Sequence, residues 1–126
     1  IGNKVLFAGS LTDMDRWYAA SDIYVHPTFY DSCSLTVLEA LASGLPVVTT
    51  RFNGAAEAIE SEESGTVIDN PADAPELAGA VSRYLDEARR VRALSASRLC
   101  MERYTPERNL AETLAVYRKV VGEDNE

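Results

Sequence analysis

The chain has 126 residues, of which 46% are hydrophobic and 25% are charged, and its formal net charge is −8. This length suits one domain with its own core. The acidic balance argues against non-specific binding to nucleic acid, which needs a basic face. A phosphate-bearing small ligand is still compatible with this charge, because a few backbone N–H groups can bind phosphate locally. The sequence has neither an apolar run long enough for a membrane span nor a signal-peptide pattern, so we expect a cytoplasmic protein.

The cysteines and the first residue say something about context. Cys33 and Cys100 show no metal-binding or redox spacing, and we interpret them as free thiols in a reducing compartment. The chain begins with Ile1 rather than Met, and an apolar run follows almost at once. We therefore interpret the chain as a piece of a longer protein.

The first half of the chain alternates short apolar runs with helical patterns. The apolar runs predict buried strands at 5–8, 23–25, 46–50 and 65–68. The helical patterns lie at 13–20, 34–42 and 55–59. Gly44 and Pro46 mark the end of the helix at 34–42, because glycine is common just after a helix and proline cannot continue one. Strands and helices that alternate with short links predict a parallel sheet with helices on its faces, an α/β fold.

The C-terminal half is expected to be helical. The predicted helices lie at 75–86, 87–102 and 106–121. Two of them carry apolar stripes at helical spacing. The stripes consist of Leu77, Val81, Tyr84 and Leu85, and of Leu110, Leu114, Tyr117 and Val121. Thr105 followed by Pro106 indicates the start of the last helix. Residues 1–126 therefore form a single domain in this interpretation.

The stretch from His26 to Thr50 is the most indicative of function. Glu39 is the one acid in a mostly aliphatic helix, and Asp31 lies eight positions before it. A buried carboxylate is costly unless it is paired or hydrogen-bonded, so Glu39 needs a partner, and a ligand is one candidate. A carboxylate there suits two ribose hydroxyls, whereas Asp31 can meet a sugar.

The loop at 27–34 strengthens this hypothesis. It follows a predicted strand, and ligands of open α/β sheets bind beyond the carboxyl ends of the strands. The residues around Ser34 are small, so their N–H groups can approach a ligand closely. Those N–H groups also begin a helix, whose positive end favours phosphate.

Each of these residues also has a plain structural interpretation. Glu39 can be a partly exposed surface acid, and Asp31 or Ser32 can cap the helix that follows. His26, the only histidine, can touch the sugar or a phosphate, or it can pack with one backbone hydrogen bond. Cys33 has no basic residue within the motif to activate it, so we interpret it as a packed side chain rather than a nucleophile.

A D-x-D pattern at 13–15 is of the kind that elsewhere holds a metal and a nucleotide sugar. We interpret it instead as a helix start, in which Thr12 and Asp15 form a capping arrangement. No metal is expected at Asp31 and Glu39 either, because no further His, Cys or acid completes a ligand set.

The stretch resembles the retaining GT-B glycosyltransferases that carry a Glu-x7-Glu motif. Members read roughly P-S-x-x-E-x-F-G-L-x-x-L-E-A-(M/L)-A-x-G-x-P-V-V. The matching positions are Pro27, Thr28, Asp31, Ser34, Leu35, Leu38, Glu39, Ala40, Leu41, Ala42, Gly44, Pro46, Val47 and Val48. The flanking segments at 19–22 and 53–57 also resemble the family, and the lead-in at 26–30 is most similar to members that build lipopolysaccharide cores.

The resemblance implies a role for each residue of the motif. Glu39 would bind the ribose of a nucleotide, and Asp31 would lie against the transferred sugar. The N–H groups of Ser34 and Leu35 would hold the diphosphate. Further contacts to the nucleotide sugar are expected from Cys33, Thr36 and His26. The chain departs from the family twice, because Asp31 is one methylene shorter than Glu and because Cys33-Ser34 replaces Phe-Gly. Donor preference is therefore expected to differ from that of typical members.

The likeness covers only the later part of the second of two Rossmann-like domains. The acceptor-binding domain, and the basic residues that neutralise the diphosphate, would lie upstream. In the family's strand order, 3-2-1-4-5-6, the predicted strands would be 3, 4, 5 and 6, with the two strands between 3 and 4 absent. We hypothesise that residues 5–8 move beside the strand at 23–25 to close this gap, or that the chain associates with another copy.

The implied function is transfer of a sugar, typically from a UDP-hexose, to a glycan or lipopolysaccharide-type acceptor with retention of configuration. The partners would be a nucleotide sugar and, through the missing domain, a glycan or lipid-linked acceptor. No cofactor is implied. The parent protein would be cytoplasmic or peripheral at the inner membrane face, and the fragment alone is expected to be nearly inactive.

The alternative is a non-catalytic protein-interaction module on an α/β scaffold, whose helical half binds a partner. Glu39 discriminates between the two. A ligand-binding acid is needed for nucleotide binding and dispensable for folding, whereas a structural acid shows the reverse.

Overall fold

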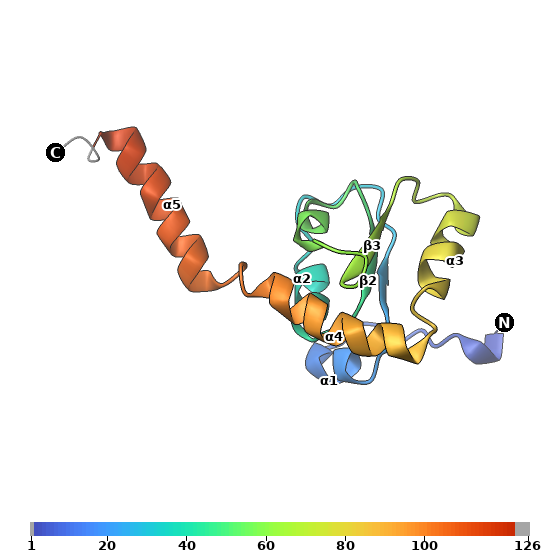
Figure 1. Cartoon of the computed structure of the whole chain (residues 1–126). Helices are drawn as coiled ribbons and strands as arrows, with labels where there is room; N and C mark the ends of the chain where they lie inside the picture. The colour runs from blue at the N-terminus through green and yellow to red at the C-terminus, as the bar shows by residue number, and fades with distance from the viewer. Residues whose placement is uncertain (1, 123–126) are drawn as a thin grey trace.

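The computed structural model describes residues 2–122 and has a three-stranded parallel sheet at its centre (Figure 1). The strands are β1 (Tyr24–His26), β2 (Val47–Thr50) and β3 (Gly65–Ile68), in the order β1-β2-β3. Val48 pairs with Val25 on one side and with Thr66 on the other. These strands and the helices between them confirm the predicted α/β fold.

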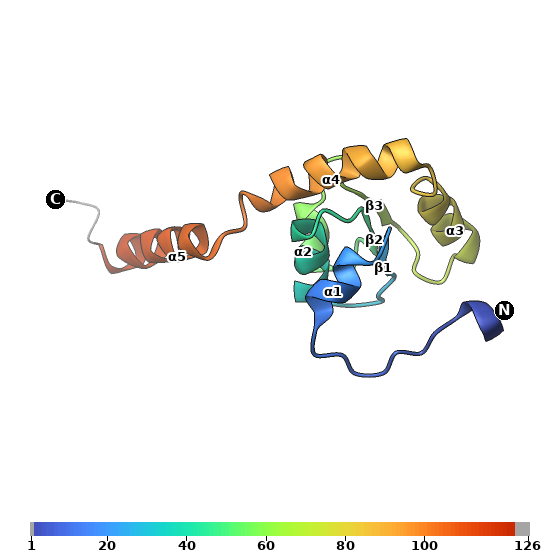
Figure 2. The same cartoon turned by 90° about the horizontal axis from the view of Figure 1, so that it is seen from below.

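The strand predicted at 5–8 is not formed. Residues Gly2–Lys4 make a short 3-10 turn, η1, and the chain then runs without pairing past the sheet to the first helix (Figure 2). Val5, Leu6 and Phe7 are 49%, 77% and 93% exposed. The hypothesis that this segment closes the gap beside β1 is therefore wrong. An apolar run is stable as a strand only when it pairs with another strand and is buried. Within residues 2–122 this segment is neither paired nor buried.

Two helices precede β2. Helix α1 (Met14–Ala19) begins after Asp13, whose side chain makes no capping hydrogen bond and lies 3.9 Å from the Arg16 guanidinium. The predicted Thr12–Asp15 capping arrangement is wrong, because the helix starts one residue too late for Thr12 to cap it. Helix α2 (Leu35–Ala42) follows Ser34.

The end of α2 is formed as the sequence predicts. Gly44 has a φ of +87°, which a residue with a Cβ adopts only with strain. The N–H groups of Gly44 and Leu45 donate to the carbonyls of Leu41 and Ala40, the paired bonds of a Schellman motif. A Cβ on Gly44 would also collide with the Leu94 side chain.

The remaining helices are η2 (Gly54–Ala58), α3 (Ala74–Ser82), α4 (Glu87–Met101) and α5 (Pro106–Val121). The helix predicted at 55–59 is a 3-10 helix. Helix α3 ends at Ser82, before the predicted 86, because the N–H groups of Tyr84 and Leu85 donate to carbonyls three residues back rather than four. Asp73, Asp86 and Thr105 each accept a hydrogen bond from the N–H group three residues further on. These caps set the boundaries of α3, α4 and α5.

Both faces of the sheet are covered, as a parallel sheet requires. Val47 of β2 packs with α1, α2 and η2, through a cluster that includes Tyr18 and Leu41. The next residue, Val48, faces the opposite side and packs with Ile68 and with buried residues of and after α3. Alternate residues of one strand thus join the two halves of the core.

Helix α4 crosses over α2 and is tied to the loops before two strands. The buried Ser97 hydroxyl lies 3.0 Å from the Leu45 carbonyl oxygen and 3.3 Å from that of Ser64. Ala93 and Cys100 are also buried on this face. One serine therefore connects α4 with the starts of β2 and β3.

Helix α5 projects away from the body of the molecule in both views (Figures 1 and 2). None of its residues is buried. The predicted stripe at Leu110, Leu114, Tyr117 and Val121 is present, but its side chains are between 39% and 68% exposed. In the other stripe, Leu85 is exposed as well. Within the described part of the chain, no helix is long and apolar enough to cross a membrane.

Candidate functional site

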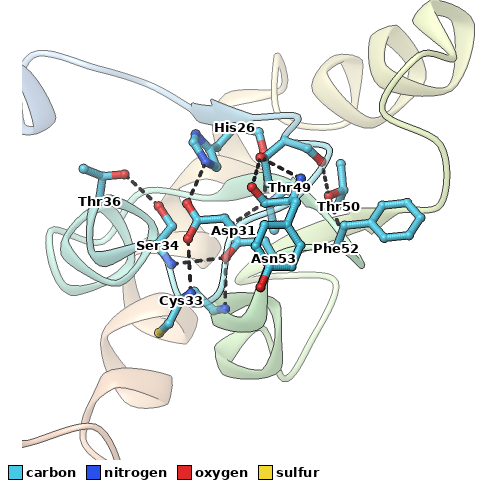
Figure 3. Close-up of polar contacts among 12 residues, drawn as sticks. His26, Asp31, Cys33, Ser34, Thr36, Thr49, Thr50, Phe52 and Asn53 are labelled. Carbon is cyan, nitrogen blue, oxygen red and sulfur yellow. Dashed lines mark hydrogen bonds and ion pairs between the residues drawn. The ribbon is translucent and has the colours of Figure 1, made fainter.

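The residues of the motif gather where β1 and β2 end, in the loops at 27–34 and 51–53 (Figure 3). This edge of a parallel sheet is where ligands of α/β proteins bind. The two loops are joined by backbone hydrogen bonds. The Asp31 N–H donates to the Phe52 carbonyl at 3.0 Å, and the Gly54 N–H donates to the Asp31 carbonyl at 3.0 Å. A Cβ on Gly54 would collide with the Ser32 carbonyl oxygen, so this approach needs glycine.

The two threonines at the end of β2, Thr49 and Thr50, hydrogen-bond to the end of β1 and to the loop at 27–34. The Thr49 hydroxyl donates to the His26 carbonyl at 2.9 Å, and the Thr50 hydroxyl donates to the Thr28 carbonyl at 2.6 Å. Both threonines are fully buried. The His26 carbonyl also accepts from the Thr28 N–H at 2.9 Å, whereas the Thr50 hydroxyl supplies a donor to the Thr28 carbonyl in the loop.

Asn53 lies at the centre of the site and was missed as a site residue by the sequence analysis. Its side chain is 2% exposed. Its Oδ1 accepts from the N–H groups of Ser34 at 3.2 Å and Ala55 at 3.0 Å, and its amide donates to the Thr49 hydroxyl at 3.1 Å. An Asn between a β-branched run and a Gly is a helix-cap signal, but nothing local indicates that it also holds the start of α2.

The N–H groups that are free at the N-terminus of α2, here called its head, differ from the predicted pair of Ser34 and Leu35, because the Ser34 N–H donates to Asn53. The Ser34 N–H is already donated, and the Cys33 N–H donates to Asp31 Oδ1 at 3.1 Å. The hydrogen bonds formed within residues 2–122 use neither the Leu35 N–H nor the Thr36 N–H. The first turn of a helix leaves such donors unpaired, so these two N–H groups are available to an anion.

Asp31 is hydrogen-bonded at one carboxylate oxygen and faces His26 with the other. Oδ1 accepts from the Cys33 N–H, and Oδ2 lies 3.4 Å from Nε2 of His26 (Figure 3). The imidazole stacks on the Tyr24 ring at 15°, with 6.2 Å between the ring centroids. Nε2 is buried and has no partner that meets hydrogen-bond geometry. The predicted backbone hydrogen bond of the His26 side chain is therefore wrong, because the ring faces the Asp31 carboxylate instead.

Glu39 lies one turn into α2 and is exposed rather than buried. The expectation that burial forces it to take a partner is wrong. It has a partner nonetheless, since the Tyr18 hydroxyl donates to Oε2 at 2.9 Å. Thr36, on the same helix, accepts from the Tyr24 hydroxyl at 2.7 Å, and its Oγ1 lies 2.9 Å from the Ser34 hydroxyl.

The two cysteines are free, as predicted. Cys100 is buried, whereas Cys33 is exposed, so the interpretation of Cys33 as a packed side chain is wrong. In Figure 3 its sulfur points away from His26 and Asp31. Among residues 2–122, no group of three or more His, Cys, Asp and Glu side chains is arranged to hold a metal ion.

An open groove of about 710 Å³ lies beside the head of α2. Cys33 and Leu35 form part of one wall, and the segment from 103 to 112 forms another. Arg103 lies 2.6 Å from Glu60, and Arg108 lies 2.7 Å from Glu112. The positive charges of that wall are thus engaged by acids.

Comparison with known proteins identifies the class of protein to which this fold and site belong. The sequence model of the family described as "Glycosyl transferases group 1" matches residues 1–87. The chain therefore belongs to this family of glycosyltransferases. This family membership confirms the resemblance drawn from the motif around Asp31 and Glu39.

Particular relatives are similar over most of the chain. The lipopolysaccharide core biosynthesis mannosyltransferase LpsB of Rhizobium meliloti is 31% identical over 96% of this chain and 35% of its own length. The lipopolysaccharide glucosyltransferase WaaG of Escherichia coli is 32% identical over 70% of this chain and 24% of its own length. The chain thus spans about a third or less of these relatives.

Solved structures share the fold. A sucrose-phosphate synthase from Thermosynechococcus elongatus has a TM-score of 0.83 and 27% identity over 97% of this chain and 31% of its own. The crystal structure of WaaG, a glycosyltransferase involved in lipopolysaccharide biosynthesis, has a TM-score of 0.69 and 28% identity over 83% of this chain and 28% of its own. The Rossmann-like architecture predicted from the sequence is therefore confirmed.

Proposed function

We propose that this chain is the nucleotide-sugar-binding part of a retaining glycosyltransferase. The observation that carries the proposal is the head of α2, where the N–H groups of Leu35 and Thr36 are without an acceptor among the described residues. An exposed carboxylate, Glu39, stands on the same helix. Donors at a helix N-terminus favour a phosphate, and a carboxylate accepts paired hydroxyl hydrogen bonds from a ribose.

The proposed roles follow the order of a nucleoside diphosphate sugar. Glu39 binds the ribose, and the N–H groups of Leu35 and Thr36 hold the diphosphate. The N–H of Ser34 is donated to Asn53, so the hydroxyl is the group through which Ser34 contributes to the diphosphate site. The protein's part in the reaction is to position the donor and to stabilise negative charge on the departing diphosphate. A UDP-hexose is the proposed donor. We propose that its binding does not depend on a metal ion held by this chain.

Asp31 is the proposed group at the sugar end of the donor. Its carboxylate is tied to the Cys33 N–H and faces His26, so its shorter side chain is held close to its own loop. A sugar must come to the loop to be touched by it. This geometry supports a donor preference that differs from that of members with a longer acid in this position.

The acceptor is proposed to bind outside this chain. Homologues named as lipopolysaccharide glycosyltransferases support an acceptor that is a glycan or a lipid-linked sugar. Because the chain spans about a third of the length of LpsB, we expect it to bind a donor and to transfer almost no sugar by itself. Detectable transfer by the pure 126-residue chain would overturn this expectation.

A protein-interaction module is the second candidate function, and α5 is the observation that favours it. This helix buries none of its residues and exposes an apolar stripe. Exposed apolar faces of this kind mark interaction surfaces. A second copy of the chain or another part of the parent protein is the proposed partner, and analytical ultracentrifugation of the chain tests self-association directly.

The donor-site proposal is tested by NMR titration with UDP, ADP and GDP. We expect millimolar UDP to shift the amide signals of Leu35 and Thr36, and we expect Glu39→Ala to need several-fold more UDP for the same shifts. Glu39 is exposed, so this variant keeps its fold and its amide spectrum elsewhere. A matched control is Glu57→Ala, an exposed acid outside α2. The absence of UDP-dependent shifts in the folded chain contradicts the proposal.

A further inference from the structure

Tyr18 is the side chain that fixes the Glu39 carboxylate, although it lies 21 positions away in the sequence. The Tyr18 ring is 4% exposed and belongs to the main hydrophobic cluster. Only its hydroxyl reaches the surface of the core, where it donates to Glu39 Oε2 at 2.9 Å and lies 3.4 Å from the Thr36 carbonyl oxygen. A rigid ring thus holds a hydroxyl at a defined place beneath α2.

The phenol is a permanent donor. Burial raises the pKa of Tyr18 above its ordinary value, and the hydrogen bond to Glu39 and the charge of that carboxylate raise it further. The hydroxyl therefore keeps its proton throughout the physiological pH range. Since the phenol keeps the proton that it donates, Oε2 of Glu39 keeps one lone pair engaged, and Oε1 and the remaining lone pairs are left to a ligand.

A second tyrosine supports the same element. The Tyr24 ring packs edge-on against Tyr18, with 5.9 Å between centroids and 72° between planes. Its hydroxyl donates to Thr36 Oγ1 at 2.7 Å. The two phenols therefore contact α2 at successive turns and restrict how it can roll on the sheet. Glu39 is long and exposed, and within residues 2–122 its carboxylate has no other hydrogen-bond partner, so its orientation depends on Tyr18.

We propose that Tyr18 is a positioning residue of the donor site, whose hydroxyl orients the Glu39 carboxylate toward the two ribose hydroxyls of a nucleoside diphosphate. This inference rests on the proposed function. It assigns to a residue outside the motif the task of pre-organising a carboxylate that would otherwise sample several rotamers. Tyr18 does not itself touch the ligand.

The test compares Tyr18→Phe with Tyr84→Phe in the 126-residue chain. Both substitutions remove one hydroxyl from a nearly buried ring, because Tyr84 is 2% exposed and its hydroxyl lies 2.8 Å from the Glu62 carbonyl oxygen, away from the site. We expect Tyr18→Phe to weaken UDP binding about five-fold, the size of a modest hydrogen-bond contribution. We expect Tyr84→Phe to leave the Kd of UDP unchanged.

A ligand without ribose hydroxyls distinguishes an effect on the orientation of Glu39 from a general effect on the fold. With 2′,3′-dideoxy-UDP, wild type and Tyr18→Phe should bind equally, because Glu39 then has nothing to hold. In the Glu39→Ala background, Tyr18→Phe should cause no further loss of UDP binding. A five-fold loss that persists in either case overturns the inference, since it would show that Tyr18 acts through the fold as a whole.

A measurement on the unbound chain keeps the result interpretable. The ¹³Cζ signal of Tyr18 should move in Glu39→Ala and stay in Glu57→Ala, which reports the hydroxyl–carboxylate contact without any ligand. An unmoved signal overturns the inference. If wild type and Tyr18→Phe bind UDP equally, the inference alone fails. If wild type binds no UDP although the ¹³Cζ signal moves, the proposed donor site fails and the inference fails with it.

Discussion

Replacing Asn53 by alanine should cost more stability than any other single polar truncation at the site. The substitution leaves two buried donors, the N–H groups of Ser34 and Ala55, without their acceptor, and it removes the amide that donates to the Thr49 hydroxyl. Each unsatisfied buried group costs about 1–3 kcal/mol. Water can relieve part of this loss at the loop, so we expect a total of about 3 kcal/mol.

The assay is equilibrium unfolding in urea, followed by circular dichroism, with Asn70→Ala as the matched control. Asn70 also accepts a backbone hydrogen bond, from the Ala72 N–H at 3.0 Å, but at the surface. We expect its loss to cost about 0.5 kcal/mol, because water replaces the acceptor. The midpoint of Asn53→Ala should fall with an unchanged m-value.

Two results would refute this reasoning. The first is a loss of less than about 1 kcal/mol for Asn53→Ala, since buried donors without partners cannot be that cheap. The second is an equal loss for Asn53→Ala and Asn70→Ala, since burial would then play no part. Amide hydrogen exchange gives an independent measure, because the Ser34 N–H should exchange faster once its acceptor is gone.

Three further predictions concern stability. Ser97→Ala should lower the free energy of unfolding by about 1–2 kcal/mol in urea, because the Leu45 carbonyl loses its donor from α4; an unchanged midpoint would contradict the tie between α4 and the sheet. Gly44→Ala should cost about 1–2 kcal/mol from the positive φ, and more if Leu94 cannot move aside; thermal unfolding that matches wild type would show that the turn relaxes. Raising the pH past the ordinary tyrosine pKa of 10.0 should destabilise the chain, because burial holds the pKa values of Tyr18 and Tyr84 above it in the folded state. This contribution is complete below pH 10 and is lost by at most about 1.4 kcal/mol per pH unit for each tyrosine above it, so Tyr18→Phe should flatten the decline in a urea series.

The parts of the fold that the sequence predicts are those fixed by neighbours in the chain. β2 and β3 are β-branched runs between turn residues, and α2 is bounded by Gly44 and Pro46, so propensity and packing agree there. The strand predicted at 5–8 is not formed, although its apolar pattern is just as clear. A strand needs a neighbouring strand to pair with, and the apolar pattern does not show whether such a neighbour is present.

The candidate site divides in the same way. Asp31, Glu39 and the head of α2 are contiguous in sequence, so their proximity follows from the helix and the loop before it. The groups that hold them are far away along the chain, with Tyr18 separated from Glu39 by 21 positions and Asn53 from Ser34 by 19. No periodicity or spacing rule connects such pairs, because only the packing of α1 and β2 around α2 brings them together.

The placement of His26 has a practical consequence. It is the only histidine in 126 residues, and its imidazole lies 3.4 Å from one Asp31 carboxylate oxygen. The imidazole resonances of an untagged sample therefore arise from a single ring, and that ring stands at the sugar end of the proposed site. Natural-abundance proton spectra can then monitor the chemistry beside Asp31 without isotopic labelling or a reporter group.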